Sequence, residues 1–357
     1  MIKIQEHLNT ANSDRILDDM AQEHWVQLNP KYKTKSGYKS NSIIEKVNKY
    51  YNESNTNDYI LEYADNNKTA AKRHRSLLFY LKKNQFKELK NIVTANPNSF
   101  NQIKARVLSK VKPSDLWNIK SGKVCQTPFG KLLSEKIFNY KAYRRSKYCI
   151  TQFTKLSFMN STCPYCNDRL VEIVKKNKTA PLANDNIAYF DLDHFYPKSI
   201  YPFFALSFYN LIPSCHICNS SEKGDLDFNV DTHIHPYFES FDDVYNFKTS
   251  LKTLLGTPLD KIDILQKINK PNDKTLVDFN LVNRYNNRIG DVEKLAKFYL
   301  NNYKKYTSQQ DLADFSEIFF ELKGVPKNKH DILKVKNGKL FRDVLSQIDI
   351  SKILQIN

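Results

Sequence analysis

The chain has 357 residues, of which 41% are hydrophobic and 26% charged, a composition that is typical of globular proteins and excludes a largely disordered one. Its formal net charge of +17 is uneven, because residues 1–160 hold 29 Lys and Arg against 13 Asp and Glu. This excess suits a polyanion such as nucleic acid, although a solvated lysine-rich surface would give the same count.

Residues 12–110 are predicted to form mostly helices. Leu77, Leu78 and Leu81 follow helical spacing within a Lys- and Arg-rich segment, so we expect them to face the core. The helical pattern resumes over residues 127–156, where aromatic side chains alternate with cations. They could stack on bases, but their spacing favours the helix core: Phe138, Tyr140, Tyr143, Tyr148 and Phe153.

The pattern changes between residues 158 and 235. Residues 186–192 predict a short strand that runs into His194, and residues 208–213 predict a second strand. A knuckle and a short helix are expected over 215–223. This strand, strand, helix unit is too small to bury a core alone, so we expect a metal to stabilise it.

Helical patterns return after residue 236. They cover residues 244–255, 259–268, 290–303 and 311–322, with an extended segment at 275–281 and a terminal segment at 338–353 that caps the fold. The sequence therefore predicts three regions, a basic and mostly helical one (1–157), a central one (158–235) and a helical C-terminal one (236–357).

Four of the six cysteines form two Cys-x-x-Cys pairs, Cys163 with Cys166 and Cys215 with Cys218. Four thiolates with this spacing can close a tetrahedral structural zinc site. In a chain of this length such pairs indicate metal binding in a reducing compartment rather than disulfides. Four buried free thiols are a poor alternative, because the spacing rarely arises twice by chance.

Two further motifs accompany these pairs. The run Asp-Leu-Asp-His-Phe-Tyr-Pro-Lys occupies residues 191–198, and Asn210 leads into the second pair, which is followed by Asn219. Together they resemble the HNH, or ββα-metal, endonucleases, particularly those with a four-cysteine zinc site. The nine-residue step between the two asparagines resembles the HNH domain of CRISPR RNA-guided nucleases. The resemblance covers about 65 of the 357 residues and implies a mainly α, α+β chain with a central ββα-metal module.

The resemblance implies roles for four side chains. His194 would be the general base that takes a proton from the attacking water, a role suited to a neutral imidazole. Asp193 and Asn219 would hold Mg²⁺ or Mn²⁺ through oxygen atoms, and removing that ion should stop cleavage but leave the fold intact. Asn210 would hold the loop that carries His194. A buried Asp–His pair that only orients a loop is the alternative.

Several neighbouring residues have more than one interpretation. Lys198 and Lys223 fit phosphate contacts, with solvated surface lysines as an equal alternative. Asp191 is expected to support the metal site indirectly, and His216 either to do the same or to be exposed. Packing is favoured over function for the other candidates: Cys125, Cys149, His233 and His235.

The leading hypothesis is a metal-dependent endonuclease that hydrolyses DNA phosphodiester bonds, with the basic first half on the phosphate backbone. The layout also resembles nucleases of bacterial anti-phage systems, including Septu-type effectors paired with an ATPase, which implies a regulatory partner. The alternatives are an RNase toxin of the same fold and an inactive zinc-dependent module for nucleic-acid binding or assembly. With neither a signal peptide nor a long apolar stretch, we expect a cytoplasmic protein without membrane contact.

Overall fold

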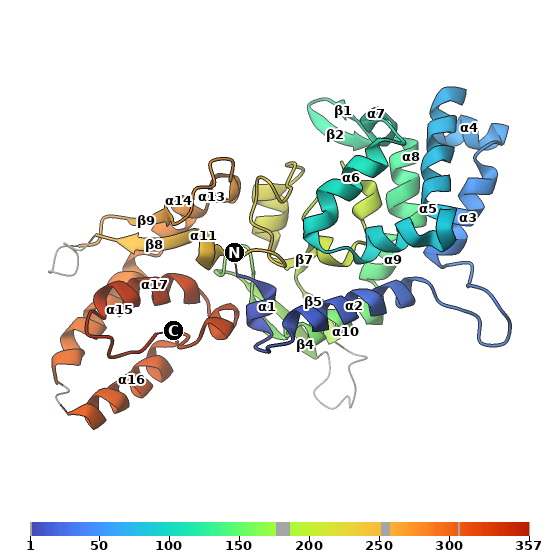
Figure 1. The fold of residues 1–357 in the computed structure, drawn as a ribbon. Coiled ribbons are helices and arrows are strands. Elements are labelled where there is room, and N and C mark those ends of the chain that lie inside the picture. The colour runs from blue at the N-terminus through green and yellow to red at the C-terminus, as the bar shows by residue number, and fades with distance from the viewer. Residues whose placement is uncertain (1, 176–185, 251–257, 306–307, 357) are drawn as a thin grey trace.

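The structure, a computed structural model, describes residues 2–175, 186–250, 258–305 and 308–356. It confirms the mainly helical α+β class that the sequence predicts. Within the described ranges, the β structure consists of four small antiparallel sheets of two or three strands. Figure 1 shows most of the N-terminal helices at one end of the molecule and the C-terminal helices at the other, with the N-terminus and the central strands between them.

Helices build most of the N-terminal region. They are α1 (Ile4–His7), α2 (Ser13–Leu28), α3 (Ile43–Glu53), α4 (Asn57–Tyr63), α5 (Lys68–Thr94), α6 (Phe100–Leu108) and α7 (Pro113–Leu116). The longest, α5, begins after Asn67, whose side chain accepts hydrogen bonds from two backbone N–H groups of the first turn. Leu77, Leu78 and Leu81 are buried as predicted, and α2 and α3 pack against α5.

A β-hairpin that the hydrophobic pattern does not reveal follows α7. In it, β1 (Trp117–Lys120) pairs with β2 (Lys123–Gln126) across a turn at Ser121 and Gly122. Both turn residues have positive φ, as a type I′ turn requires. Short helical segments then lead to the central region: α8 (Pro128–Lys131), η2 (Leu132–Ile137), α9 (Tyr140–Arg144) and α10 (Lys147–Lys155).

The central region contains both predicted strands, but the first is split. Its elements are β3 (Asn160–Thr162), β4 (Leu170–Lys175), β5 (Asn186–Tyr189), β6 (Asp191–His194), η4 (Pro202–Phe204), η5 (Phe208–Asn210), β7 (Leu211–Ser214) and η6 (Ile217–Lys223). β5 joins the sheet of β3 and β4, whereas β6 pairs with β7 and sets His194 opposite Leu211. The second strand starts later than predicted, because residues 208–210 form a 3₁₀ turn.

Three secondary-structure predictions for the C-terminal region are wrong. Strands replace the helices expected over residues 244–255 and 259–268, and residues 275–281 are helical rather than extended. Apolar runs this short do not distinguish strand from helix, and here strand pairing decides. Residues 251–255 lie outside the described part of the chain. The observed elements are α11 (Phe241–Val244), β8 (Tyr245–Thr249), β9 (Ile262–Gln266), α13 (Thr275–Asp278), α14 (Leu281–Asn286), α15 (Ile289–Asn302), α16 (Gln309–Lys323), η8 (Lys329–Lys334) and α17 (Gly338–Ile348).

One continuous hydrophobic core extends from Ile2 through the central region to Val344, and a second cluster lies between α15, α16 and α17. Phe138, Tyr143 and Phe153 are buried in the first core, as their spacing favours. The central strands are therefore held by packing from the regions before and after them. None of the helices in the described residues combines the length and apolar character needed to cross a bilayer.

Three histidines of this core make stability depend on pH. Burial lowers the pKa of His24 and of His74 to about 4, and that of His235 to about 3. The unfolded chain therefore binds protons first, so the stability from these groups is present above about pH 6.5 and is lost as the pH falls toward 4.

We expect the free energy of unfolding, measured from urea curves, to fall between pH 7.5 and 5, by up to about 1.4 kcal/mol per histidine for each pH unit. Most carboxylates stay ionised over this range. A His24→Gln protein should show a shallower dependence, and a midpoint that is constant over the range would contradict the prediction.

Candidate functional site

The four predicted zinc ligands lie together. The sulfur atoms of Cys163, Cys166, Cys215 and Cys218 all lie within 4.8 Å of one another, and all four residues are buried. The Sγ atoms of Cys166 and Cys215 are 3.9 Å apart, close to an edge of a tetrahedron whose metal–sulfur bonds are about 2.3 Å. This donor set fits a metal ion such as zinc. Burial raises the pKa of the Cys163 thiol, and a bound cation would favour its thiolate form.

Residues of the C-terminal region complete the surroundings of the cysteines. Arg284 of α14 lies with Nη1 3.3 Å from the Sγ of Cys218, and the Tyr285 hydroxyl donates to the Cys166 carbonyl. Four thiolates carry four negative charges, whereas a zinc ion supplies only two positive ones. The Arg284 guanidinium adds a further positive charge beside the sulfurs.

His194 ends β6 and is held by one ring nitrogen. Its Nε2 lies 3.1 Å from the Ala205 carbonyl, which requires the hydrogen to be on Nε2 and leaves a lone pair on Nδ1. In the described residues no group hydrogen-bonds to Nδ1. The Tyr140 ring packs edge-on against the imidazole at 4.4 Å. Burial, followed by the charge of Lys198, lowers the pKa of His194 to about 3, so the imidazole is neutral at neutral pH.

Asn210 ties together the loop that follows His194. Its Oδ1 accepts from the Tyr196 N–H at 2.7 Å, and its Nδ2 donates to the carbonyls of Tyr196 and Phe204 at 3.1 Å each. The side chain is fully buried, so these bonds do not compete with water. Asn210 thereby holds the two ends of the segment that carries Ala205, the partner of His194.

Asp193 is buried with both carboxylate oxygens engaged. Oδ2 accepts from the Tyr165 hydroxyl at 2.6 Å, and Oδ1 pairs with the Lys223 ammonium at 2.7 Å. Lys223 also donates to the His194 carbonyl at 2.5 Å and is only 2% exposed, so it is not a solvated surface lysine. Burial lowers the pKa of Lys223, while the Asp193 charge opposes that shift.

Asn219 lies on η6 and faces Asp191. Its Nδ2 donates to Asp191 Oδ2 at 3.0 Å and to Ser220 Oγ at 3.2 Å. This leaves its Oδ1 as an acceptor with no partner in the described residues. His216 is exposed and its Nδ1 lies 2.9 Å from the same oxygen of Asp191. Asp191 therefore orients Asn219 rather than facing Asp193.

Asp193, His194 and Asn219 line one open cavity of about 350 Å³. Lysines 131, 198 and 223 also line it, together with Val124 and Gln126 of the hairpin β1–β2. The Lys198 ammonium lies 4.8 Å from the centre of the Tyr140 ring, and Gln126 donates to the Lys198 carbonyl at 2.6 Å. Glu135 and Asp225 line it as well, so three lysines and three carboxylates surround the imidazole of His194 and the side-chain oxygen of Asn219.

His233 and His235 pack against aromatic rings and do not line this cavity. His233 stacks on Phe228 at 3.5 Å and pairs with Asp278, and His235 lies against Phe195 at 4.1 Å. Of the two other cysteines, Cys149 is buried and Cys125 is partly buried.

The sequence pattern missed two residues that connect the cysteines to their surroundings. Tyr165, inside the first Cys-x-x-Cys pair, reaches Asp193, and its place between two ligands was the available signal. Asn167 donates to the carbonyls of Ile332 and Val335 and accepts from the Lys339 N–H. These contacts span more than 150 residues, so no local pattern could have revealed them.

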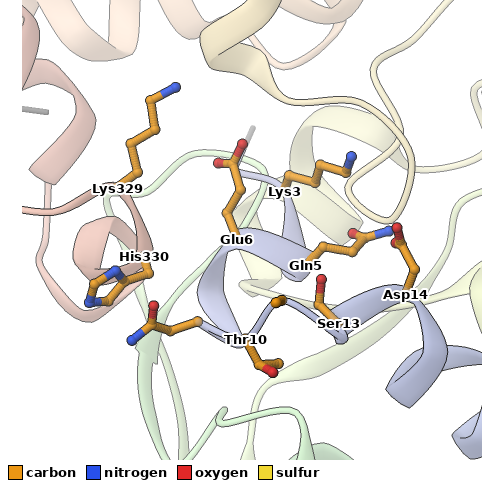
Figure 2. A pocket seen from close by; sticks show the side chains of 10 residues that line it. Lys3, Gln5, Glu6, Thr10, Ser13, Asp14, Lys329 and His330 are labelled. Carbon is orange, nitrogen blue, oxygen red and sulfur yellow. The ribbon is translucent and has the colours of Figure 1, made fainter.

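A second surface cavity, of about 470 Å³, has a different character. Figure 2 shows that Lys329 and His330 reach it from the C-terminal region, whereas the other labelled side chains belong to the first 14 residues. Glu6 lies among them, and burial raises its pKa. This cavity contains none of the predicted site residues, so the cavity of Asp193 and His194 is the better candidate.

The Asp193–Lys223 pair predicts a large stability effect. Replacing Lys223 with methionine leaves a buried carboxylate uncompensated, which should reduce the free energy of unfolding by about 3–5 kcal/mol. The double variant Asp193→Asn/Lys223→Met should recover much of this loss. Lys198→Met, which breaks no ion pair of the described residues, is the matched control and should cost about 1 kcal/mol or less. Equal urea midpoints for both single variants would contradict the ion pair.

Similarity to known proteins covers short segments only. The chain is 35% identical to Septu protein PtuB of Bacillus thuringiensis over 81 residues, 23% of this chain and 26% of that protein. It is 48% identical to protein ea31 of Escherichia phage lambda over 52 residues, 14% of this chain and 17% of that protein. No protein-family model matches, and no solved structure is significantly similar. The chain therefore spans less than a third of either relative.

Proposed function

We propose that the chain is a metal-dependent endonuclease of the HNH type that hydrolyses DNA phosphodiester bonds in anti-phage defence. The observation that carries the proposal is the state of His194, a neutral imidazole with a free Nδ1 lone pair on the wall of an open cavity that Lys198 and Asn219 also line. The partial similarity to a Septu protein supports the defence role.

His194, Lys198 and Asn210 have different roles in hydrolysis. His194 Nδ1 takes the proton of the attacking water, and the Nε2 hydrogen bond to Ala205 holds the ring in the tautomer that can do so. Lys198 faces the phosphate as a positive charge. Asn210 acts indirectly, because it holds the segment that orients the imidazole.

A divalent ion fits the remaining oxygen donors. An ionised carboxylate has about four acceptor positions, and Tyr165 and Lys223 use two of those on Asp193. The Oδ1 of Asn219 supplies a second ligand, and hard cations such as Mg²⁺ or Mn²⁺ prefer such oxygens. When bound, the ion would supply Lewis-acid stabilisation of the charge that develops on the phosphate oxygens.

Zinc at the four cysteines would serve structure rather than chemistry. Its shell is complete with four thiolates, which leaves no open position for substrate. It would fix the backbone around Tyr165 and the start of η6. Tyr165 and Lys223, which ends η6, are the two residues that contact Asp193.

The test is a digest of supercoiled plasmid, single-stranded DNA and tRNA with Mg²⁺ or Mn²⁺, followed by mapping of the ends. We expect nicked and linear DNA with 5′-phosphate and 3′-hydroxyl ends. Cleavage of tRNA alone would favour the RNase alternative. Absence of cleavage on every substrate, together with retained DNA binding, would favour the inactive binding module.

A further inference from the structure

The hairpin β1–β2 stands beside the candidate active site and has an unusual surface. Trp117, Ile119, Val124 and Gln126 share one face, because directly paired residues and alternate residues of a strand point the same way. Val124 and Gln126 line the cavity of His194. Ile119 continues this face toward the tip and is 67% exposed.

The tip of the hairpin is basic. Lys120 and Lys123 flank the turn, are exposed and lie on the face opposite Ile119. Neither forms a salt bridge with any residue that the structure describes. Lys131 and Lys198 lie near the base, on the wall of the cavity. The tip of the hairpin therefore presents positive charge on one face and an apolar side chain on the other, which an ordinary solvated hairpin does not need.

The base of the hairpin is rigid. Arg73 of α5 binds both carboxylate oxygens of Asp115, just before β1, at 2.6 and 2.5 Å. Gly130 packs so closely that a β-carbon there would lie 2.0 Å from the Leu116 carbonyl oxygen. Gln126 connects β2 to the loop of Lys198. Any ligand of the tip is thereby held at a fixed offset from His194.

We propose that this hairpin enters the major groove of B-form DNA next to the phosphate that is cut. The inference rests on the proposed nuclease function and specifies its substrate as duplex DNA. A two-stranded ribbon fits the B-DNA major groove, which is about 12 Å wide, whereas the deep, narrow major groove of A-form RNA excludes it. Lys120 and Lys123 contact the flanking phosphates, and Ile119 packs on base edges such as the thymine methyl group.

The reach of the hairpin agrees with this placement. The turn lies two to three residues beyond Val124, or roughly 7–10 Å at about 3.3 Å per residue. This is less than one groove width, so a phosphate in the cavity and a groove at the tip can belong to one duplex. Figure 1 shows the hairpin at the top of the N-terminal helical region, next to α7.

Binding is measured first in the His194→Ala protein, which separates it from cleavage. We expect Lys120→Gln/Lys123→Gln to weaken binding of a labelled 30-base-pair duplex about tenfold and to reduce the slope of log K against log salt by about two. Ile119→Thr, which keeps a β-branched residue in the strand, should weaken binding about threefold without changing the slope. The matched control is Lys294→Gln/Lys297→Gln on α15, for which we expect no change.

The following outcomes distinguish the hairpin inference from the nuclease proposal. If the protein cuts plasmid but the hairpin variants bind and cut like the α15 control, the hairpin inference is wrong and the nuclease proposal stands. If hairpin-dependent DNA binding is found but no version cuts, the nuclease proposal is wrong and only the contact of the hairpin with the groove stands. The major-groove ligand methyl green should compete with the hairpin, and competition by the minor-groove ligand netropsin instead, or equal hairpin effects on an RNA duplex, would overturn the groove assignment.

Discussion

A His194→Ala protein is expected to cut supercoiled DNA about 10²- to 10⁴-fold more slowly than the unchanged chain, while remaining folded. The loss follows from the role of Nδ1 as the proton acceptor, for which alanine offers no replacement. The free energy of unfolding should fall by about 1–3 kcal/mol, because the buried Ala205 carbonyl loses its hydrogen-bond donor.

The pH dependence gives this prediction a second readout. Because burial and the nearby lysine lower the pKa of His194 to about 3, the base is already neutral at pH 6. The cleavage rate should therefore not rise through pH 6.5 as it would for an exposed histidine. A rate that increases about tenfold per pH unit between 5.5 and 6.5 would show that the imidazole titrates in the normal range.

Two controls separate chemistry from packing. Added imidazole should restore part of the activity of His194→Ala, because it can occupy the vacated cavity and accept the proton. His330→Ala removes a histidine of the other surface cavity and should leave cleavage unchanged. Equal cleavage by the unchanged chain and by His194→Ala would exclude the proposed base.

The part of the site that the sequence could predict is the part encoded in short spacings. Two Cys-x-x-Cys pairs place their sulfurs together in the fold, as their spacing requires. Asp193 and His194 reach the same cavity as Asn219, because β6 and β7 are adjacent antiparallel strands and η6 follows β7 directly.

The contacts of Asp193 could not be predicted in the same way. Tyr165 and Lys223 are separated from it by 28 and 30 residues, and each is buried only because the regions on both sides cover it. Lysine is normally exposed, so a solvated Lys223 was a reasonable expectation, and the cost of burying it is offset by the paired carboxylate.

The sequence pattern predicts the wrong secondary structure where tertiary contacts determine whether a segment is strand or helix. Residues 262–266 have apolar spacing that fits a helix, yet they form β9, which pairs with β8. Packing of α17 against β8 covers the pair, and that neighbour lies about 100 residues away in the sequence. The hairpin β1–β2 was missed for a related reason. Each of its strands has only four residues, and polar residues interrupt the apolar pattern of both.

Zinc removal is expected to have the largest effect on stability, and Cys163→Ser is the variant that tests it. A structural zinc contributes on the order of 10–16 kcal/mol in small domains, comparable to the whole stability of a typical domain. We expect Cys163→Ser to lose zinc and to unfold the central region over residues 158–235. Cys149→Ser changes a buried cysteine away from the cluster, so it should keep its zinc and lose only about 1–3 kcal/mol.

Unfolding should extend from the cysteines into the C-terminal region and stop short of the N-terminal helices. Asn167 carries three backbone hydrogen bonds of residues 332–339, and Asp168 pairs with Arg288 at 2.9 Å. These bonds depend on the knuckle that Cys163 begins, whereas α2 and α3 both pack on α5. Hydrogen exchange should therefore rise in η8 and α17 together with the central strands, while α5 stays protected. A Cys163→Ser protein that retained its zinc and its exchange pattern would show that the four sulfurs do not hold the fold.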